Sequence, residues 1–211
     1  MRLTKYTHAC VRLERDGAVL VIDPGAFSEA ESLDGADAVL ITHEHADHLD
    51  PAKLTDALAR RPDLTVYTHQ AVADQLTALG GAVRTVAAGE AFTAAGFEIR
   101  AYGGQHAVIH ADVPQIANLG YLIEGSVFHP GDSVHDVPDG VEVETLLLPV
   151  NAPWLKVSEA VDFARAVAPG RAYALHDHLL SAAGAQVYGG ILTRLAGCDY
   201  QRLEPGTTVT V

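Results

Sequence analysis

Four side chains that can bind a metal ion lie within six consecutive residues of the chain. His43, His45 and His48 supply imidazole nitrogens, and Asp47 supplies a carboxylate. Zinc and other borderline transition-metal ions select these two kinds of donor. The apolar run 38–41 comes just before them and indicates a buried strand. Because open α/β sheets present their chemistry at the carboxyl ends of strands, this pattern predicts a metal site rather than a solvated polar loop.

Three further metal-binding residue types follow other predicted strands. His106, Asp132 and His176 each stand at or shortly after the end of an apolar or alternating segment. With the first cluster they make five histidines and two aspartates, which can complete two metal coordination shells. Asp23 also ends a strand, but it opens an Asp-Pro-Gly sequence, which we interpret as an ordinary turn.

The composition fits an enzyme that acts on a small molecule. The 211 residues are 48% hydrophobic and 19% charged, so a sizeable core can form, and we expect one domain over 1–211. Acidic residues outnumber basic ones 27 to 14, for a formal net charge of −13. Such a surface repels phosphate backbones and anionic membranes. We therefore expect a small-molecule substrate, with no nucleic-acid partner and no membrane contact.

The cysteines and the N-terminus favour a cytoplasmic location. Cys10 and Cys198 are too few for a disulfide framework, which agrees with a reducing compartment. The first five residues run straight into an alternating strand pattern, without a signal peptide. No apolar run approaches the roughly 20 residues needed to cross a bilayer.

Strand and helix patterns alternate in both halves of the chain. Strands are predicted at 1–7, 10–14, 18–22, 38–41, 64–68, 83–86, 97–102, 119–124, 126–129, 145–150, 171–175, 200–203 and 207–211. Helices are predicted from Pro51 to about Arg61 with Asp50 as the cap, over 70–79, from a cap at Ser158 to Pro169, and over 186–195. This order predicts an α/β fold with two sheets face to face and helices outside.

The ordered motif His43-x-His45-x-Asp47-His48, His106, Gly131-Asp132 and His176 resembles that of the metallo-β-lactamase superfamily. The resemblance covers nearly the whole chain and implies a four-layer αββα sandwich. It also implies the ligands: His43, His45 and His106 for a first metal ion, Asp47, His48 and His176 for a second, and Asp132 as the bridge between them.

The segment Tyr6-Thr7-His8-Ala9-Cys10 and the short chain are most similar to a small single-domain branch of that superfamily. This branch includes ascorbate-6-phosphate lactonase and the N-acylphosphatidylethanolamine phospholipase D type. The resemblance also allows a homo-oligomer.

The implied ligand set is suited to hydrolysis. Three neutral imidazoles leave an open position on the first ion, where the pKa of bound water falls to about 7. A bridging carboxylate holds two ions about 3.5–4 Å apart, so that they can share a nucleophilic hydroxide. We therefore expect a dinuclear hydrolase that cleaves a small ester, lactone or phosphodiester. Zinc is the expected ion, and manganese or iron suits the same donors.

Two other functions are compatible with the same residues. The first is a mononuclear iron dioxygenase that acts on a persulfide, although the complete second set of ligands counts against it. The second is a metal-binding protein without catalysis, which would lack an accessible pocket.

Diiron flavoprotein oxygen reductases of the superfamily typically carry Glu where this chain has His45, and they append a flavodoxin-like domain for which 211 residues leave no room.

His8 and Asp47 are the candidate catalytic residues. His8 lies in the N-terminal motif that the small branch places near the site, where it could contact substrate or transfer a proton. Side chains close in sequence to proposed ligands could support those ligands by hydrogen bonds; these are His110, Asp177 and His178. The remaining candidates are given structural roles: His69 as a helix start, His129 and His135 as loop residues, and Trp154 and Tyr188 as core, with the wall of an apolar pocket as the alternative for the last two.

Overall fold

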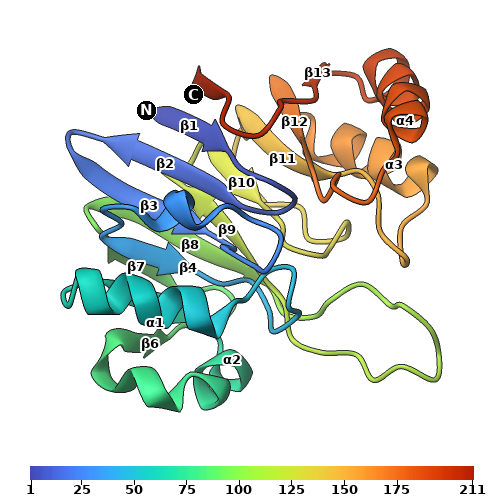
Figure 1. The fold of residues 1–211 in the computed structure, drawn as a ribbon. Coiled ribbons are helices and arrows are strands. Elements are labelled where there is room, and N and C mark those ends of the chain that lie inside the picture. Colours follow the sequence, from blue (N-terminus) through green and yellow to red (C-terminus); the bar gives the residue numbers. More distant parts are fainter.

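Two β-sheets face each other in the computed structural model, which describes residues 1–211 (Figure 1). The first sheet contains β1 (Arg2–Lys5), β2 (Val11–Arg15), β3 (Ala18–Ile22), β4 (Ala38–Leu40), β5 (Thr65–Thr68), β6 (Val83–Thr85) and β14 (Thr208–Thr210). The second contains β7 (Ala91–Ala94), β8 (Phe97–Gly103), β9 (Leu119–Ile123), β10 (Val127–His129), β11 (Thr145–Pro149), β12 (Arg171–Leu175) and β13 (Asp199–Gln201). Their strand orders are β14-β1-β2-β3-β4-β5-β6 and β13-β12-β11-β10-β9-β8-β7.

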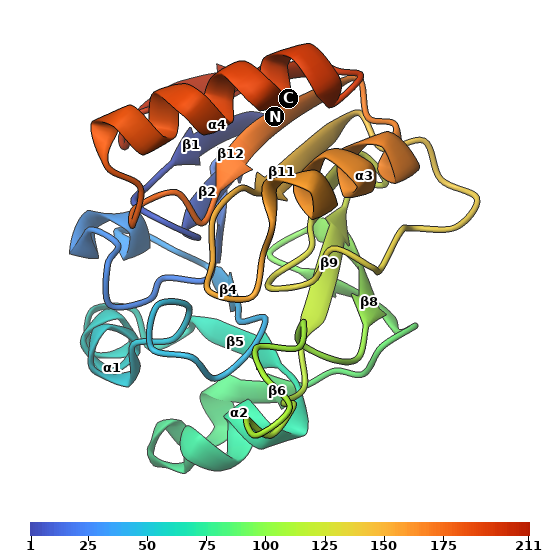
Figure 2. The same ribbon diagram turned by 90° about the vertical axis from the view of Figure 1, so that its right-hand side faces the viewer.

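Helices cover the outer faces of the two sheets (Figure 2). The first sheet carries α1 (Pro51–Arg60) and α2 (Gln70–Gln75), and the second carries α3 (Val157–Val167) and α4 (Ala182–Leu195). Short 3₁₀ helices occupy Ala30–Leu33 and Thr77–Ala82. None of the helices is long and apolar enough to span a membrane. The predicted four-layer αββα sandwich is confirmed.

Alternate side chains of each central strand enter different cores. In β3, Leu20 and Ile22 lie in the core between the sheets, whereas Val21 lies in the core beneath α1 and α2. In β11, Leu147 points between the sheets and Leu148 packs toward α3. Because side chains of a strand alternate between its faces, a strand covered on both faces must be apolar throughout. This explains the continuous apolar runs in the sequence.

Some predicted helix boundaries were wrong. The helix predicted over 70–79 ends at Gln75, and a 3₁₀ helix follows in which Gly80 has a φ of 55°. Ser158 does not cap α3, which begins at Val157 after the cap residue Lys156. The last helix starts at Ala182 rather than 186, since the Ser181 hydroxyl caps it by accepting from the Gly184 N–H at 3.1 Å. Its first turn is exposed and rich in alanine, so it lacks an apolar pattern.

β7 was not predicted. It is the edge strand of the second sheet and pairs antiparallel with β8 through a turn at Ala95 and Gly96, both of which have positive φ. Its sequence Ala-Phe-Thr-Ala is only four residues long and half alanine, a residue depleted in strands.

Strand direction brings the polar loops to one edge of the sandwich. In the first sheet β3, β4 and β5 run parallel, and in the second β10, β11 and β12 run parallel. β2 runs antiparallel to β3 with Val11 opposite Ile22, so the β1–β2 loop lies at the carboxyl end of β3. His8, in that loop, is therefore placed at the same edge as the residues that follow β3 and β4.

Candidate metal centre

The first group of candidate ligands consists of His43, His45, His106 and Asp132. Their ligand atoms all lie within 4.8 Å of one another. His43 Nε2 is 3.1 Å from His45 Nδ1, and His106 Nε2 is 3.2 Å from Asp132 Oδ2. The residues follow β4, β8 and β10, so both sheets contribute. Three imidazoles and a carboxylate are a donor set suited to a tetrahedral divalent ion.

The second group consists of His8, Asp47, His48 and His176, again with ligand atoms within 4.8 Å of one another. Asp47 Oδ2 is 3.0 Å from His8 Nε2, 3.3 Å from His176 Nε2 and 3.9 Å from His48 Nε2. Three of these residues are the predicted second set. His8 joins them as a direct neighbour of Asp47.

Asp132 lies between the two groups. Its Oδ1 is 3.1 Å from His48 Nε2, and its Oδ2 is 3.3 Å from His176 Nε2 as well as 3.2 Å from His106 Nε2. The carboxylate is buried. One side chain therefore contacts imidazoles of both groups.

Several buried atoms of the two groups make no hydrogen bond. They are Nε2 of His48, His106 and His176 and Oδ1 of Asp132. Buried polar atoms in proteins are nearly always partnered, and imidazole Nε2 is a common metal ligand. The side chains present therefore fit a divalent ion at each group.

Outer hydrogen bonds fix the orientation of four of the imidazoles. Nδ1 of His43 lies 2.9 Å from Thr42 Oγ1, and Nδ1 of His48 lies 2.7 Å from Asp23 Oδ2. Nδ1 of His106 lies 2.6 Å from the Ala107 carbonyl, and Nδ1 of His176 lies 2.7 Å from the Asn151 carbonyl. An acceptor at Nδ1 places the ring proton there, which leaves the Nε2 lone pair directed into the groups.

Asp23 supports candidate ligands of both groups, and its interpretation as only a turn residue was wrong. Its carboxylate accepts from the backbone N–H of Thr42 at 2.8 Å and from the Thr42 hydroxyl at 2.6 Å, and it contacts His48 Nδ1 at 2.7 Å. Since the Thr42 hydroxyl is also 2.9 Å from His43 Nδ1, Asp23 orients His48 directly and His43 through Thr42. Asp23 is fully buried, which the Asp-Pro-Gly sequence did not reveal.

Two glycines allow the loops to approach closely. A Cβ on Gly25 would lie 2.0 Å from the carbonyl oxygen of Asp47. Gly131 has a φ of 62°, and a Cβ there would lie 2.2 Å from Oδ1 of Asn118. That same Oδ1 accepts from the backbone N–H of Asp132 at 3.0 Å, so Asn118 fixes the loop that carries Asp132.

Charges in the two groups shift each other's pKa values. Burial disfavours the charged form of His176, but Asp132 and Asp47 outweigh it and raise the pKa of His176 to about 9. Burial also disfavours the charged form of His48, but the carboxylates of Asp132 and Asp23 outweigh it and hold the pKa of His48 well above the ordinary value. For Asp132 burial opposes ionisation, yet His48 and His176 hold its pKa well below the usual range.

His8 is held in place by a buried lysine that the sequence did not single out. His8 has a φ of 67°, a left-handed conformation that is rare for a residue with a side chain. Lys5 is 1% exposed, and its ammonium donates to the carbonyl of His8 at 2.7 Å. The same carbonyl accepts from the His176 N–H at 3.2 Å. Asp177 lies 3.5 Å from Lys5 Nζ and 2.7 Å from Arg202, so it supports this network rather than a ligand imidazole.

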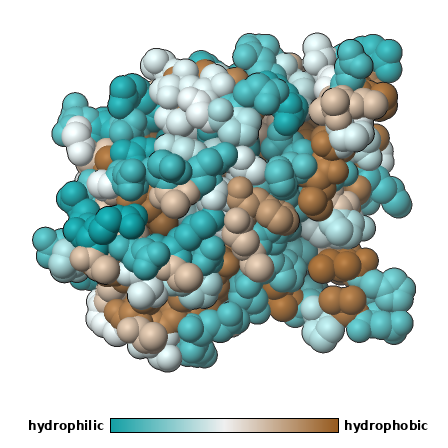
Figure 3. Space-filling view, viewed as in Figure 1, coloured by the Kyte–Doolittle hydropathy of each residue, from teal (hydrophilic) through white to brown (hydrophobic).

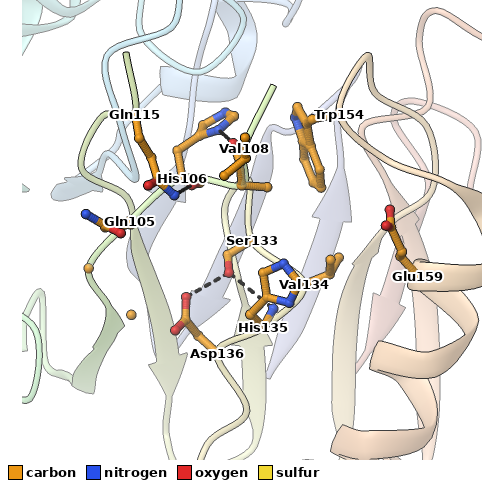
Figure 4. A pocket seen from close by; sticks show the side chains of 13 residues that line it. Gln105, His106, Val108, Gln115, Ser133, Val134, His135, Asp136, Trp154 and Glu159 are labelled. Atoms are coloured by element: carbon orange, nitrogen blue, oxygen red, sulfur yellow. Dashed lines mark hydrogen bonds between the residues drawn. The ribbon is translucent and has the colours of Figure 1, made fainter. Parts of the chain in front are cut away.

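Trp154 is not a core residue, contrary to our expectation. It is partly exposed, and its Nε1 donates to Oδ2 of Asp132 at 3.1 Å. It also lines a cavity of about 500 Å³ whose wall includes His106 (Figure 4). The candidate metal centre therefore borders a space large enough for a small molecule.

One long loop projects from the sandwich beside the centre. It joins β8 to β9, and it extends away from the sheets in Figure 1. Its exposed Val108, Ile109 and Val113 form apolar surface on this projection (Figure 3). His110 lies on the same loop, exposed and outside both groups, so it supports no ligand.

The other histidines have varied positions. His69 is the cap residue of α2, as predicted. His129 is fully buried at the end of β10, where its Nε2 is 3.0 Å from the Ala9 carbonyl; it is not a loop residue. His135 is exposed and lines the cavity. The His178 ring lies 6.4 Å from the His8 ring and contacts no ligand by a hydrogen bond.

The sandwich and its paired histidine–aspartate groups define a protein of the metallo-β-lactamase fold. A model of the β-lactamase superfamily domain matches residues 2–176. The chain is 40% identical to Protein Rv0786c of Mycobacterium tuberculosis over 100% of both chains. It is 30% identical to a UPF0173 metal-dependent hydrolase of Methanopyrus kandleri, over 83% of this chain and 84% of that protein. The structure of Igni18, a metallo hydrolase of Ignicoccus hospitalis, superposes with a TM-score of 0.77 at 20% identity, over 99% of this chain and 97% of that chain.

The chain therefore belongs to the β-lactamase superfamily. The smaller branch with the lactonase and the phospholipase stays a prediction.

Proposed function

We propose that this protein is a dinuclear metal-dependent hydrolase that cleaves a small ester, lactone or phosphodiester. The observation that carries the proposal is the position of Asp132, whose two oxygens lie within 3.3 Å of imidazole nitrogens from both groups. A carboxylate so placed can hold two divalent ions as a pair. Zinc is the expected ion, with manganese or iron as alternatives.

Each ion has a proposed set of protein ligands. His43, His45 and His106 would hold the first, Asp47, His48 and His176 the second, and Asp132 both. When bound, the two ions would supply a hydroxide nucleophile and Lewis acidity for the oxyanion and leaving group.

Asp47 and His8 are the proposed catalytic residues. Burial lowers the pKa of His8 to about 4, so its ring is neutral near pH 7. A neutral ring can donate from Nε2 to Asp47 Oδ2 at 3.0 Å. The pair is therefore placed to hold or move a proton beside the second group.

The cavity beside His106 supports a small-molecule substrate. Its volume of about 500 Å³ lies in the range of small-ligand sites. An accessible cavity counts against a metal-binding protein without catalysis, and the complete second group counts against a mononuclear iron dioxygenase. The net charge of −13 counts against a nucleic acid or an anionic membrane as partner.

Elemental analysis of the purified protein tests this proposal first. We expect two zinc or manganese ions per chain in the native protein and a lower content in His106→Ala. His135→Ala removes an exposed imidazole that lies outside both groups, and it should keep the native content. Lactone, ester and phosphodiester substrates would then be screened before and after chelation. One iron per chain, with oxygen uptake on addition of a persulfide, would contradict the proposal and favour the dioxygenase.

A further inference from the structure

The cavity beside the metal centre has an unusual set of charges. Asp136 and Glu159 line it, and its other ionisable groups are the imidazoles of His106 and His135. No lysine or arginine lines the cavity, and neither carboxylate forms an ion pair within the protein. Such a cavity disfavours an anionic group and leaves two carboxylates without a cationic partner.

Trp154 adds an aromatic wall to the same cavity. In Figure 4 its ring stands between His106 and Glu159, and Asp136 and His135 lie on the opposite side of the space. An indole ring is the aromatic group that attracts cations most strongly, and the attraction increases when the cation is partly desolvated. The aromatic wall is thus an observation independent of the two carboxylates, and it favours the same kind of ligand.

The cavity borders the proposed site of reaction at His106. His106, which lines it, is 2% exposed, and its Nε2 has no hydrogen-bond partner. Trp154 contacts Asp132 through its Nε1. A molecule seated in the cavity therefore lies against His106, a member of the first group, and beside the Trp154 ring that contacts Asp132.

We propose that this cavity binds a positively charged group, such as a quaternary ammonium, on the substrate of the hydrolase. The ammonium contacts the Trp154 ring and lies near Asp136 and Glu159, while the bond to be cleaved lies toward His106. This inference rests on the proposed function, because it assigns the cavity to the same substrate. It makes a phosphorylated or carboxylated substrate tail unfavourable at this position.

The sole tryptophan of the chain offers a binding test that needs no turnover. The probes are choline, the uncharged alcohol in which carbon replaces the quaternary nitrogen, and the carboxylate that carries the same tert-butyl group. Each is titrated into the metal-loaded protein while Trp154 fluorescence is recorded. We expect choline to bind about tenfold more tightly than the carbon isostere, and the carboxylate to bind most weakly. Equal affinities, or tighter binding of the carboxylate, would overturn the inference.

Two variants locate the effect. Asp136→Asn with Glu159→Gln removes both charges but keeps an oxygen that can accept from the Ser133 hydroxyl and from the Lys156 N–H. This double variant should show a smaller preference for choline over its isostere, because only the Trp154 ring still attracts the cation. Asp162→Asn is the matched control, because Asp162 lies one turn further along α3 and does not line this cavity. It should keep the preference, and a loss there would mean that the general negative field, not the cavity, attracts the cation.

Hydrolysis of matched esters separates this inference from the proposed function. The substrates are an acetyl ester of choline and the acetyl ester of its carbon isostere. A higher kcat/KM for the choline ester supports both proposals. Turnover of both esters without preference would overturn the cation site and leave the hydrolase standing. Preferential binding of choline without hydrolysis of any ester, lactone or phosphodiester would overturn the proposed hydrolase and leave the cation site standing.

Discussion

The carboxylate of Asp23 lies 2.7 Å from Nδ1 of His48, and both side chains are completely buried. Carboxylates in this position raise the basicity of a ligand histidine and fix its tautomer. Asp23→Asn would present an amide to His48 and to Thr42, so one of three hydrogen bonds must be lost. We expect metal affinity to fall by roughly 10- to 100-fold, as measured by competition with a chelator.

Asp16→Asn is the control for that variant. Asp16 is an exposed turn residue with a φ of 53°, a conformation that Asn also tolerates. Its metal affinity should match that of the native protein. If Asp23→Asn also kept the metal affinity of the native protein, Asp23 would do no more than form a turn.

Asp132→Ala should lower the metal content toward one ion per chain and nearly abolish hydrolysis. The reason is that Asp132 is the one carboxylate that contacts imidazoles of both groups. Elemental analysis and single-substrate kinetics check both outcomes. Asp139→Ala, at an exposed position further along the same loop, should change neither.

Metal binding should release protons at neutral pH. Without metal the pKa of His176 is about 9 and that of His48 is well above its ordinary value, so both rings are protonated at pH 7. A ligand histidine must be neutral, and the apparent affinity should therefore rise with pH up to about 9. Calorimetry in buffers of different ionisation enthalpy measures the number of protons released. A pH-independent affinity between pH 7 and 9 would contradict these protonation states.

The raised pKa of His176 predicts how the stability of the metal-free protein varies with pH. The folded-state pKa of His176 lies above the unfolded value of about 6.5. Its contribution to the free energy of unfolding is therefore complete below about pH 6.5. It should be lost as pH rises through about 9, which urea denaturation in the presence of a chelator would detect.

Gly131→Ala and Gly125→Ala form a matched pair. Both glycines have a φ of 62°, so alanine at either position costs about 1–2 kcal/mol of backbone strain. A Cβ at Gly125 meets nothing within 4 Å, whereas a Cβ at Gly131 lies 2.2 Å from Asn118 Oδ1. We expect Gly131→Ala to lose about 3 kcal/mol or more in the free energy of unfolding. Equal losses in the two variants would show that Asn118 moves away freely.

His8→Ala should leave the metal content unchanged and lower kcat by about 10²- to 10⁴-fold. The predicted ligands of the second ion are complete without His8, whereas its Nε2 contacts Asp47. Loss of one ion from this variant would mean that His8 is itself a ligand.

The sequence indicated much of this protein because its strongest signals are local. His43, His45, Asp47 and His48 lie within one loop, so their types and spacing predict a shared site before any fold is known. The buried strands are equally readable, since a strand covered on both faces, such as β3, must be apolar at every position. Helix ends were less readable where the first turn is exposed, as at Ala182.

Only the tertiary structure decided which side chains surround that loop. Asp23 contacts a histidine 25 residues away, His8 contacts an aspartate 39 residues away, and Lys5 lies against Asp177 across 172 residues. Each of these residue types is common in turns or on surfaces, and none carries a periodic pattern that predicts its burial. Their roles arise because strands from both ends of the chain meet at one edge of the sandwich. Trp154 belongs to the same class, since only packing places its indole beside Asp132 and a cavity instead of in the core.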